Sequence, residues 1–159
     1  MDLILPLSIT LGTVTYGVVA KWYVMPALAG RPRSQALIPL LVPHCFRYIG
    51  MAFLIPGVTS VPLDPRFADP AAWGDLLAGV LALITIIALR KGWTLAVPLV
   101  WIFSIEGTLD LLNALYKGLR HTTSGGMGAT YFIPAIIVPA LLVTHFIIFV
   151  ILLRRTTEA

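Results

Sequence analysis

Five long apolar stretches, separated by short polar segments, dominate the pattern of this chain. They cover approximately residues 3–20, 36–58, 71–89, 94–116 and 129–153. A membrane-spanning helix needs about 20 mostly apolar residues, within a range of roughly 17–25. The apolar residues do not alternate with polar ones in the period of two that a membrane β-strand requires. The pattern therefore predicts an all-α, polytopic transmembrane helix bundle with five spans, forming a single integral-membrane domain over residues 1–159.

The first apolar stretch is the weakest of the five. It is short unless the helix continues to Leu28 past Lys21, whose long side chain can reach the membrane surface. In a four-span alternative, this segment lies in the membrane interface. The letters ALA at 27–29 resemble a signal-peptidase site, but no basic residue precedes the apolar stretch. We therefore expect an uncleaved first span.

Composition supports a membrane protein over a soluble one. The chain is 58% hydrophobic and 11% charged, with a mean hydropathy of +0.94, whereas soluble domains carry about 25% charged residues. The net charge of +4 could suggest nucleic-acid binding, but the basic residues lie at the ends of the apolar stretches. This placement favours the lipid bilayer as partner and argues against nucleic acid. The single cysteine, Cys45, excludes an intrachain disulfide and any CxxC motif.

The distribution of basic residues predicts the orientation of the chain. With five spans, one side of the membrane receives seven basic residues, namely Lys21, Arg31, Arg33, Arg90, Lys91, Arg154 and Arg155. The other side receives three, Arg66, Lys117 and Arg120, together with Asp2, Asp64 and Asp69. Cytoplasmic loops carry the excess of lysine and arginine. We therefore expect a bacterial inner (plasma) membrane protein with its N-terminus outside and its C-terminus in the cytoplasm.

Ionisable residues inside the spans point to a buried site. At a rise of about 1.5 Å per residue, Arg47 lies about 16 Å from the inner edge of the second span, and Glu106 lies at about 18 Å in the fourth. Asp110 follows at about 24 Å. A charge at the bilayer centre costs about 2.5–3.5 kcal/mol on insertion scales. We therefore expect Arg47 to contact Glu106, Asp110 or both in the interior of the bundle.

Helical spacing groups further polar residues with these charges. On an α-helix, residues at i, i+3, i+4 and i+7 share one face, which predicts two polar faces. The first holds His44, Arg47, Tyr48 and Met51, and the second holds Glu106, Asp110, Asn113 and Lys117. The candidate site thus consists of Glu106 and Asp110 as acid–base groups, with His44, Arg47, Tyr48 and Asn113 as ligand-binding residues.

This arrangement predicts a site that binds or relays a small ligand or a proton. Two carboxylates one helical turn apart cannot easily both be charged in a low-dielectric interior, so one of them is expected to carry a proton. If Arg47 holds Glu106 ionised, Asp110 is the proton carrier and His44 is the relay. A protonated and an ionised carboxyl would also supply the two halves of acid–base chemistry on a lipid-like molecule.

Other interpretations remain open at this level. His44 and His145 both lie about 12 Å from the inner edge, so they could be axial ligands of a b-type haem. A metal site that adds Glu106 and Asp110 suits the ligand types, but these acids lie nearer the outer face. The chain also lacks the sequence motifs of nucleophile elbows, phosphate loops and zinc sites. It could therefore be an accessory or assembly subunit that packs on a membrane-protein partner or on a second copy of itself.

Overall fold

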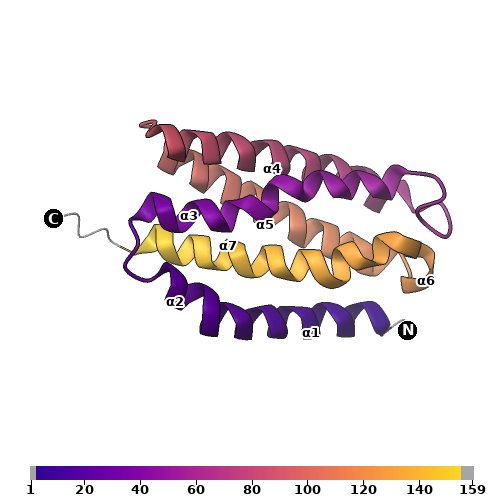
Figure 1. Cartoon of the computed structure of the whole chain (residues 1–159). Helices are drawn as coiled ribbons and strands as arrows, with labels where there is room; N and C mark the ends of the chain where they lie inside the picture. The colour runs from indigo at the N-terminus through magenta and orange to yellow at the C-terminus, as the bar shows by residue number, and fades with distance from the viewer. Residues whose placement is uncertain (1–2, 155–159) are drawn as a thin grey trace.

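The computed structural model describes residues 3–154, and over this range the protein consists of helices and contains no strand (Figure 1). Five helical segments are long and apolar enough to cross a membrane, judged by length and composition. They run Ile4–Leu28, Arg33–Leu54, Pro65–Lys91, Ala96–His121 and Ile133–Leu153. The prediction of an all-α bundle with five candidate spans is confirmed, and the five apolar helices indicate a membrane protein. Asp2 and Arg155, which were used to predict the orientation, lie outside the described residues.

The first segment is a full-length helix. It comprises α1 (Ile4–Val19), a π-helical turn (Ala20–Val24) and α2 (Met25–Leu28). It continues past Lys21, whose side chain is exposed, and α1 lies side by side with α7 (Val138–Leu153) in Figure 1. Close approach occurs at Gly12, where an added Cβ would lie 3.0 Å from the Ala135 carbonyl oxygen. This geometry supports five spans over the four-span alternative.

The second segment changes helix type near its middle. It begins as α3 (Arg33–Leu41) and continues as a 3₁₀-helix, η2 (Val42–Leu54). The change follows a pair of prolines four residues apart, Pro39 and Pro43, because Pro43 has no amide hydrogen to bond the Pro39 carbonyl. A 3₁₀-helix has three residues per turn, and runs longer than 3–4 residues are uncommon. Residues three apart therefore face the bundle, and the buried ones are His44, Arg47, Gly50 and Phe53.

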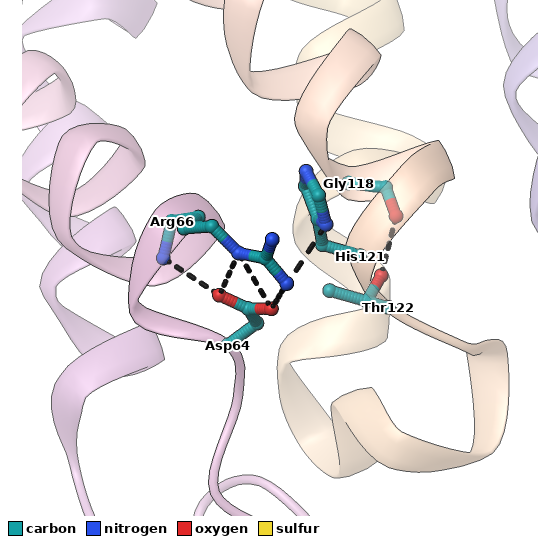
Figure 2. Close-up of polar contacts among 5 residues, drawn as sticks. All are labelled: Asp64, Arg66, Gly118, His121 and Thr122. Atoms are coloured by element: carbon teal, nitrogen blue, oxygen red, sulfur yellow. Dashed lines mark hydrogen bonds and ion pairs between the residues drawn. The ribbon is translucent and has the colours of Figure 1, made fainter.

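The third helix, α4 (Pro65–Lys91), begins earlier than the apolar pattern predicts. The Asp64 side chain caps it by accepting a hydrogen bond from the Arg66 amide at 2.9 Å (Figure 2). Pro65 occupies the first helical position. Aspartate at the N-cap followed by proline is a favoured helix start. The helix therefore begins six residues before the predicted start of the third span at residue 71, which places Asp75 almost three turns into the helix.

The helices pack closely because α4 carries small residues on its buried side. Ala78 and Ala82 are fully buried, as expected for helix packing in lipid. At Gly79, an added Cβ would lie 3.6 Å from backbone atoms of His44, Cys45 and Tyr48, so α4 packs directly on the backbone of η2. The fourth helix, α5 (Ala96–His121), packs beside α4. The chain then passes through α6 (Ser124–Met127), η3 (Gly128–Tyr131) and the π-helical η4 (Ile133–Ile137) into α7.

Candidate functional site

Arg47 lies at the centre of a buried polar cluster formed by three helical segments. Its side chain is fully enclosed, and the residue is only 1% exposed. Nε donates to Asp75 Oδ1 at 2.7 Å, Nη2 donates to Asp110 Oδ2 at 2.5 Å, and Nη1 donates to the Gly107 carbonyl at 3.3 Å. The two aspartate side chains are each 10% exposed. Arg47 in η2 thus ties α4 and α5 together through charge-assisted hydrogen bonds.

The expected contact between Arg47 and Asp110 is confirmed, but its second carboxylate partner was missed. That partner is Asp75 on α4, rather than Glu106. The apolar pattern places the start of the third span near residue 71. Asp75 would then lie only about one turn into the predicted helix, close to the membrane surface. The dipeptide Asp64–Pro65 could have identified Asp75 as a buried residue. It is a favoured helix start, and a helix that begins there places Asp75 almost three turns from its start.

Three glycines make room for the buried cluster. An added Cβ at Gly50 would collide with the Asp75 side chain, and one at Gly74 would collide with the Asp110 carboxylate. At Gly107 it would lie 2.8 Å from His145 Nε2 and 2.9 Å from Arg47 Nη1. Each helix that contributes to the ion pairs therefore supplies a glycine where a neighbouring polar side chain needs space.

Two buried histidines lie against this cluster. His44 Nε2 and Thr144 Oγ1 are 2.9 Å apart, and the Thr144 hydroxyl donates to backbone carbonyls of its own helix. The threonine oxygen is thus left as the acceptor, which places a proton on His44 Nε2. His44 Nδ1 and both ring nitrogens of His145 are buried and have no hydrogen-bond partner among residues 3–154. Three polar atoms next to Arg47 are therefore unsatisfied.

The geometry of the histidines does not fit a haem. Axial imidazoles lie on opposite faces of the porphyrin, each with a nitrogen about 2 Å from the metal. The rings of His44 and His145 instead contact each other with centroids 4.3 Å apart, and Phe103 lies 5.0 Å from each ring. No space for a porphyrin exists between them. Within residues 3–154, no group of three or more histidine, cysteine, aspartate or glutamate side chains is arranged to hold a metal ion.

Glu106 lies beside the cluster without belonging to its ion pairs. It is half-buried on α5, one turn before Asp110, and it lies within electrostatic range of Arg47, Asp75 and Asp110. Its Oε2 atom is buried and has no hydrogen-bond partner among the described residues. The structure therefore contains a third carboxyl close to a single guanidinium that is already shared by two aspartates.

Two of the predicted ligand-binding residues do not lie in the cluster. Tyr48 is 55% exposed on the outside of the bundle. The α-helical spacing that grouped it with His44 does not apply, because η2 has three residues per turn and so presents only residues three apart on one face. Asn113 is also exposed, because the side of α5 that faces the bundle runs through Gly107 and Leu111 instead. The site thus comprises Arg47, Asp75, Asp110, Glu106, His44 and His145.

A narrow apolar cavity leads toward this cluster. It has a volume of about 20 Å³, and Asp75 is the only acidic residue among residues 3–154 that lines it. Its walls include Leu5 and Ile9 of α1, Phe53 of η2 and Leu111 of α5. A cavity needs roughly 10–15 Å³ to hold one water molecule. The cavity therefore has room for about one water molecule beside the buried aspartate.

Comparison with known proteins supplies a family for the whole bundle. None of the curated proteins and none of the solved structures matches the chain. A family model described as a domain of unknown function, DUF8737, matches residues 4–153, which include all five long helices and every residue of the cluster. The chain therefore belongs to the DUF8737 family.

Proposed function

We propose that this protein is an inner-membrane helical protein whose buried Arg47 cluster holds and exchanges a proton or binds the polar group of a small ligand. One observation carries the proposal: a single buried guanidinium pairs with two aspartates and lies within electrostatic range of a third carboxyl, Glu106, while nearby polar atoms have no partner among residues 3–154. Ionisable side chains within membrane spans are costly and mark proton and ligand pathways. A purely structural ion pair needs neither the third carboxyl nor the unsatisfied histidines.

Glu106 is the proposed proton carrier. Arg47 directs Nε and Nη2 to Asp75 and Asp110, so these two carboxylates share the positive charge. A third ionised carboxylate with a buried, unpartnered oxygen would add uncompensated negative charge to the interior, which is strongly unfavourable. A proton on Glu106 removes that charge. The sequence had suggested Asp110 for this role, but the contacts of Arg47 favour Glu106.

The histidines are proposed to complete the site. His44 Nδ1 and the His145 nitrogens can each accept or donate a hydrogen bond once a proton or ligand group arrives. The apolar cavity that Asp75 lines would admit one water molecule beside the cluster. With both a protonated and an ionised carboxyl, the same groups could perform acid–base chemistry on a lipid-like molecule.

Infrared difference spectroscopy tests the proton assignment. Spectra of the purified protein from about pH 4 to about pH 9 span the free and shifted carboxyl ranges. We expect a protonated carboxyl band that disappears in Glu106→Gln. Asp69→Asn is the matched control, because Asp69 is exposed near the start of α4. If all carboxyls titrate like free ones near pH ~4, or if the band survives in Glu106→Gln, the assignment is wrong.

A second candidate function, that of an accessory subunit, is favoured by the position of α1. In an apolar stretch of 18 residues in the first segment, only 11% is buried inside the protein. The corresponding stretches of the other four segments are 33–44% buried. Its outward side chains, including Leu7, Leu11 and Val14, are each more than half exposed. A partner helix would cover this face.

Cysteine labelling tests this candidate function. In a Cys45→Ser background, Leu11→Cys should be protected from labelling in native membranes but accessible after purification. Leu109→Cys on α5 should react equally in both preparations.

The orientation is proposed from the charges at the two ends of the bundle. The start of α3, the end of α4 and the end of α7 lie at the same end of the bundle (Figure 1). This end carries most of the basic residues among residues 3–154. This end is proposed to be cytoplasmic by the positive-inside rule. Cysteines placed at Thr94 and at Ser60, in the same Cys45→Ser background, should react with a membrane-impermeant reagent from opposite sides. Labelling of both from one side would contradict this orientation.

A further inference from the structure

At the end of the bundle opposite the start of α1, a pocket combines arginines with an apolar wall. It has a volume of about 180 Å³ and lies between the α2–α3 connection and the last turns of α7. Three arginines line it, Arg31, Arg33 and Arg154. Its apolar lining includes Met25, Leu28, Ile147, Val150 and Ile151. This pocket is separate from the Arg47 cluster, none of whose residues lines it.

The arginines of this pocket have unused capacity to bind an anion. Arg33 donates from Nη2 to the Leu152 carbonyl at 2.7 Å, but its Nε atom is buried and has no partner among residues 3–154. Arg31 and Arg154 are exposed, and no ion pair within that range involves either. A buried donor without an acceptor is unfavourable, so an anionic oxygen at this position would stabilise the pocket.

The start of α3 adds positive potential to the same place. The helix has nine residues, and its N-cap residue, Pro32, provides no side-chain cap. Its first amides have no carbonyl partners within the helix, and the helix dipole is positive at this end. The positive end of the α3 dipole therefore lies at a pocket that three arginines line, and this combination is suited to holding a phosphate.

We infer that this pocket binds the phosphate headgroup of an anionic membrane phospholipid. The arginines and the α3 N-terminus would hold the phosphate, and the apolar wall along α2 and α7 would contact the glycerol and the upper acyl chain. The apolar lining favours a lipid over free phosphate, because an inorganic ion would leave Ile147, Val150 and Ile151 without an apolar partner. Basic pockets between membrane helices are a known chemical solution for anionic headgroups.

Titration of the delipidated full-length protein in detergent tests this inference by native mass spectrometry. The three probes are phosphatidylglycerol, phosphatidylcholine with the same acyl chains, and inorganic phosphate. We expect phosphatidylglycerol to bind most tightly. The variant Arg31→Gln/Arg154→Gln should weaken its binding on the order of ten-fold, since each exposed arginine contributes favourable electrostatics. Arg33 stays intact because it also bonds the end of α7.

The matched control is Arg90→Gln/Lys91→Gln, which removes the same charge from the same end of the bundle but outside the pocket. This variant should bind phosphatidylglycerol as the unmodified protein does. An equal loss in both variants would overturn the inference in favour of non-specific attraction. Equal binding of phosphatidylcholine would show that the arginines do not select the lipid. Equal binding of inorganic phosphate would show an ion site without a lipid.

Discussion

Two aspartate–arginine ion pairs with the same shortest distance occupy opposite environments in this protein. Arg47 and Asp110 approach to 2.5 Å inside the bundle, where their side chains are 0% and 10% exposed. Arg66 and Asp64 also approach to 2.5 Å, but at the start of α4, with side chains 72% and 23% exposed (Figure 2). The chemistry of the two pairs is identical. Their surroundings and their separation along the chain decide what each contributes.

The buried cluster joins distant parts of the chain, whereas the exposed pair is local. Arg47 is 28 residues from Asp75 and 63 residues from Asp110, so its bonds hold η2, α4 and α5 together. Arg66 is two residues from Asp64, so its bonds only strengthen the cap of one helix. Breaking a buried pair costs about 3–5 kcal/mol because a charge is stranded, while exposed pairs contribute about 0–1 kcal/mol. Proximity alone is therefore a poor guide to the importance of an ion pair.

The largest expected effect comes from removing the central guanidinium. Arg47→Met leaves Asp75 and Asp110 buried without their cation, so we expect the free energy of unfolding to fall by about 3–5 kcal/mol. Unfolding of the purified protein in mixed micelles with increasing denaturing detergent measures it. Arg66→Met is the matched control on the exposed pair and should change stability far less than Arg47→Met does, because solvent screens that pair.

A partial rescue sharpens this prediction. Adding Asp75→Asn and Asp110→Asn to Arg47→Met removes the stranded negative charges and should recover part of the lost stability. Strictly additive losses across the single, double and triple variants would mean that the three side chains do not act as one unit.

The next largest effect concerns the space that the cluster requires. Gly74→Ala would place a methyl group against the Asp110 carboxylate, and overpacking of this kind costs about 1–3 kcal/mol. Gly17→Ala on α1 is the matched control, because nothing lies within 4 Å of an added Cβ there. We expect it to leave stability unchanged or slightly raised, since alanine favours a helix. Equal losses in the two variants, measured by the same unfolding assay, would argue against a sterically demanding cluster.

An effect of similar size should separate the carboxyls of the cluster from each other. Asp75→Asn removes a charged acceptor from Arg47 and should cost about 1.5–3 kcal/mol, the range for hydrogen bonds to charged groups. Glu106→Gln replaces a carboxyl that the proposed function already treats as neutral. Its effect on unfolding should therefore stay within about 0.5 kcal/mol. A larger loss from Glu106→Gln would indicate that Glu106 is ionised and paired.

The smallest effect is expected at the exposed pair, and it depends on pH. The side-chain hydrogen bonds from Arg66, reinforced by the Arg66 amide, lower the pKa of Asp64 from its ordinary value of 3.8 to about 2. Because folding lowers this pKa, the contribution to stability is present above pH 3.8 and is lost as the pH falls toward 2.

Carboxyl chemical shifts from nuclear magnetic resonance in detergent can check this titration. Arg66→Gln should return the Asp64 midpoint toward 3.8. Since His121 Nδ1 lies 3.9 Å from the Asp64 carboxylate, His121→Gln should move the midpoint less than Arg66→Gln does. The reverse order would mean that the histidine, rather than the arginine, controls this pair.

The parts of the fold that follow from short-range patterns could be predicted from the sequence. The length and apolarity of five stretches are sufficient to indicate five helices. The cost of a buried charge requires that Arg47 meet a carboxylate. Depth along the fourth helix favoured Glu106, which Arg47 does not contact, and the i, i+4 spacing from Glu106 identified Asp110 as the other candidate. Errors arose where a local detail changed the geometry. The helix start at Asp64–Pro65 places Asp75 almost three turns into the helix instead of about one, and the 3₁₀ geometry after Pro43 turned Tyr48 outward.

The sequence by itself determined that this chain forms apolar helices long enough to cross a membrane and that an arginine lies deep within one of them, since these properties depend only on composition and on position along a helix. Tertiary structure alone decided which carboxyls Arg47 contacts. That choice depends on how each helix is rotated about its own axis, which no one-dimensional pattern records. Small residues at Gly50, Gly74 and Gly107 let the helices approach in one rotation, in which Asp75 and Asp110 reach the guanidinium and Glu106 does not.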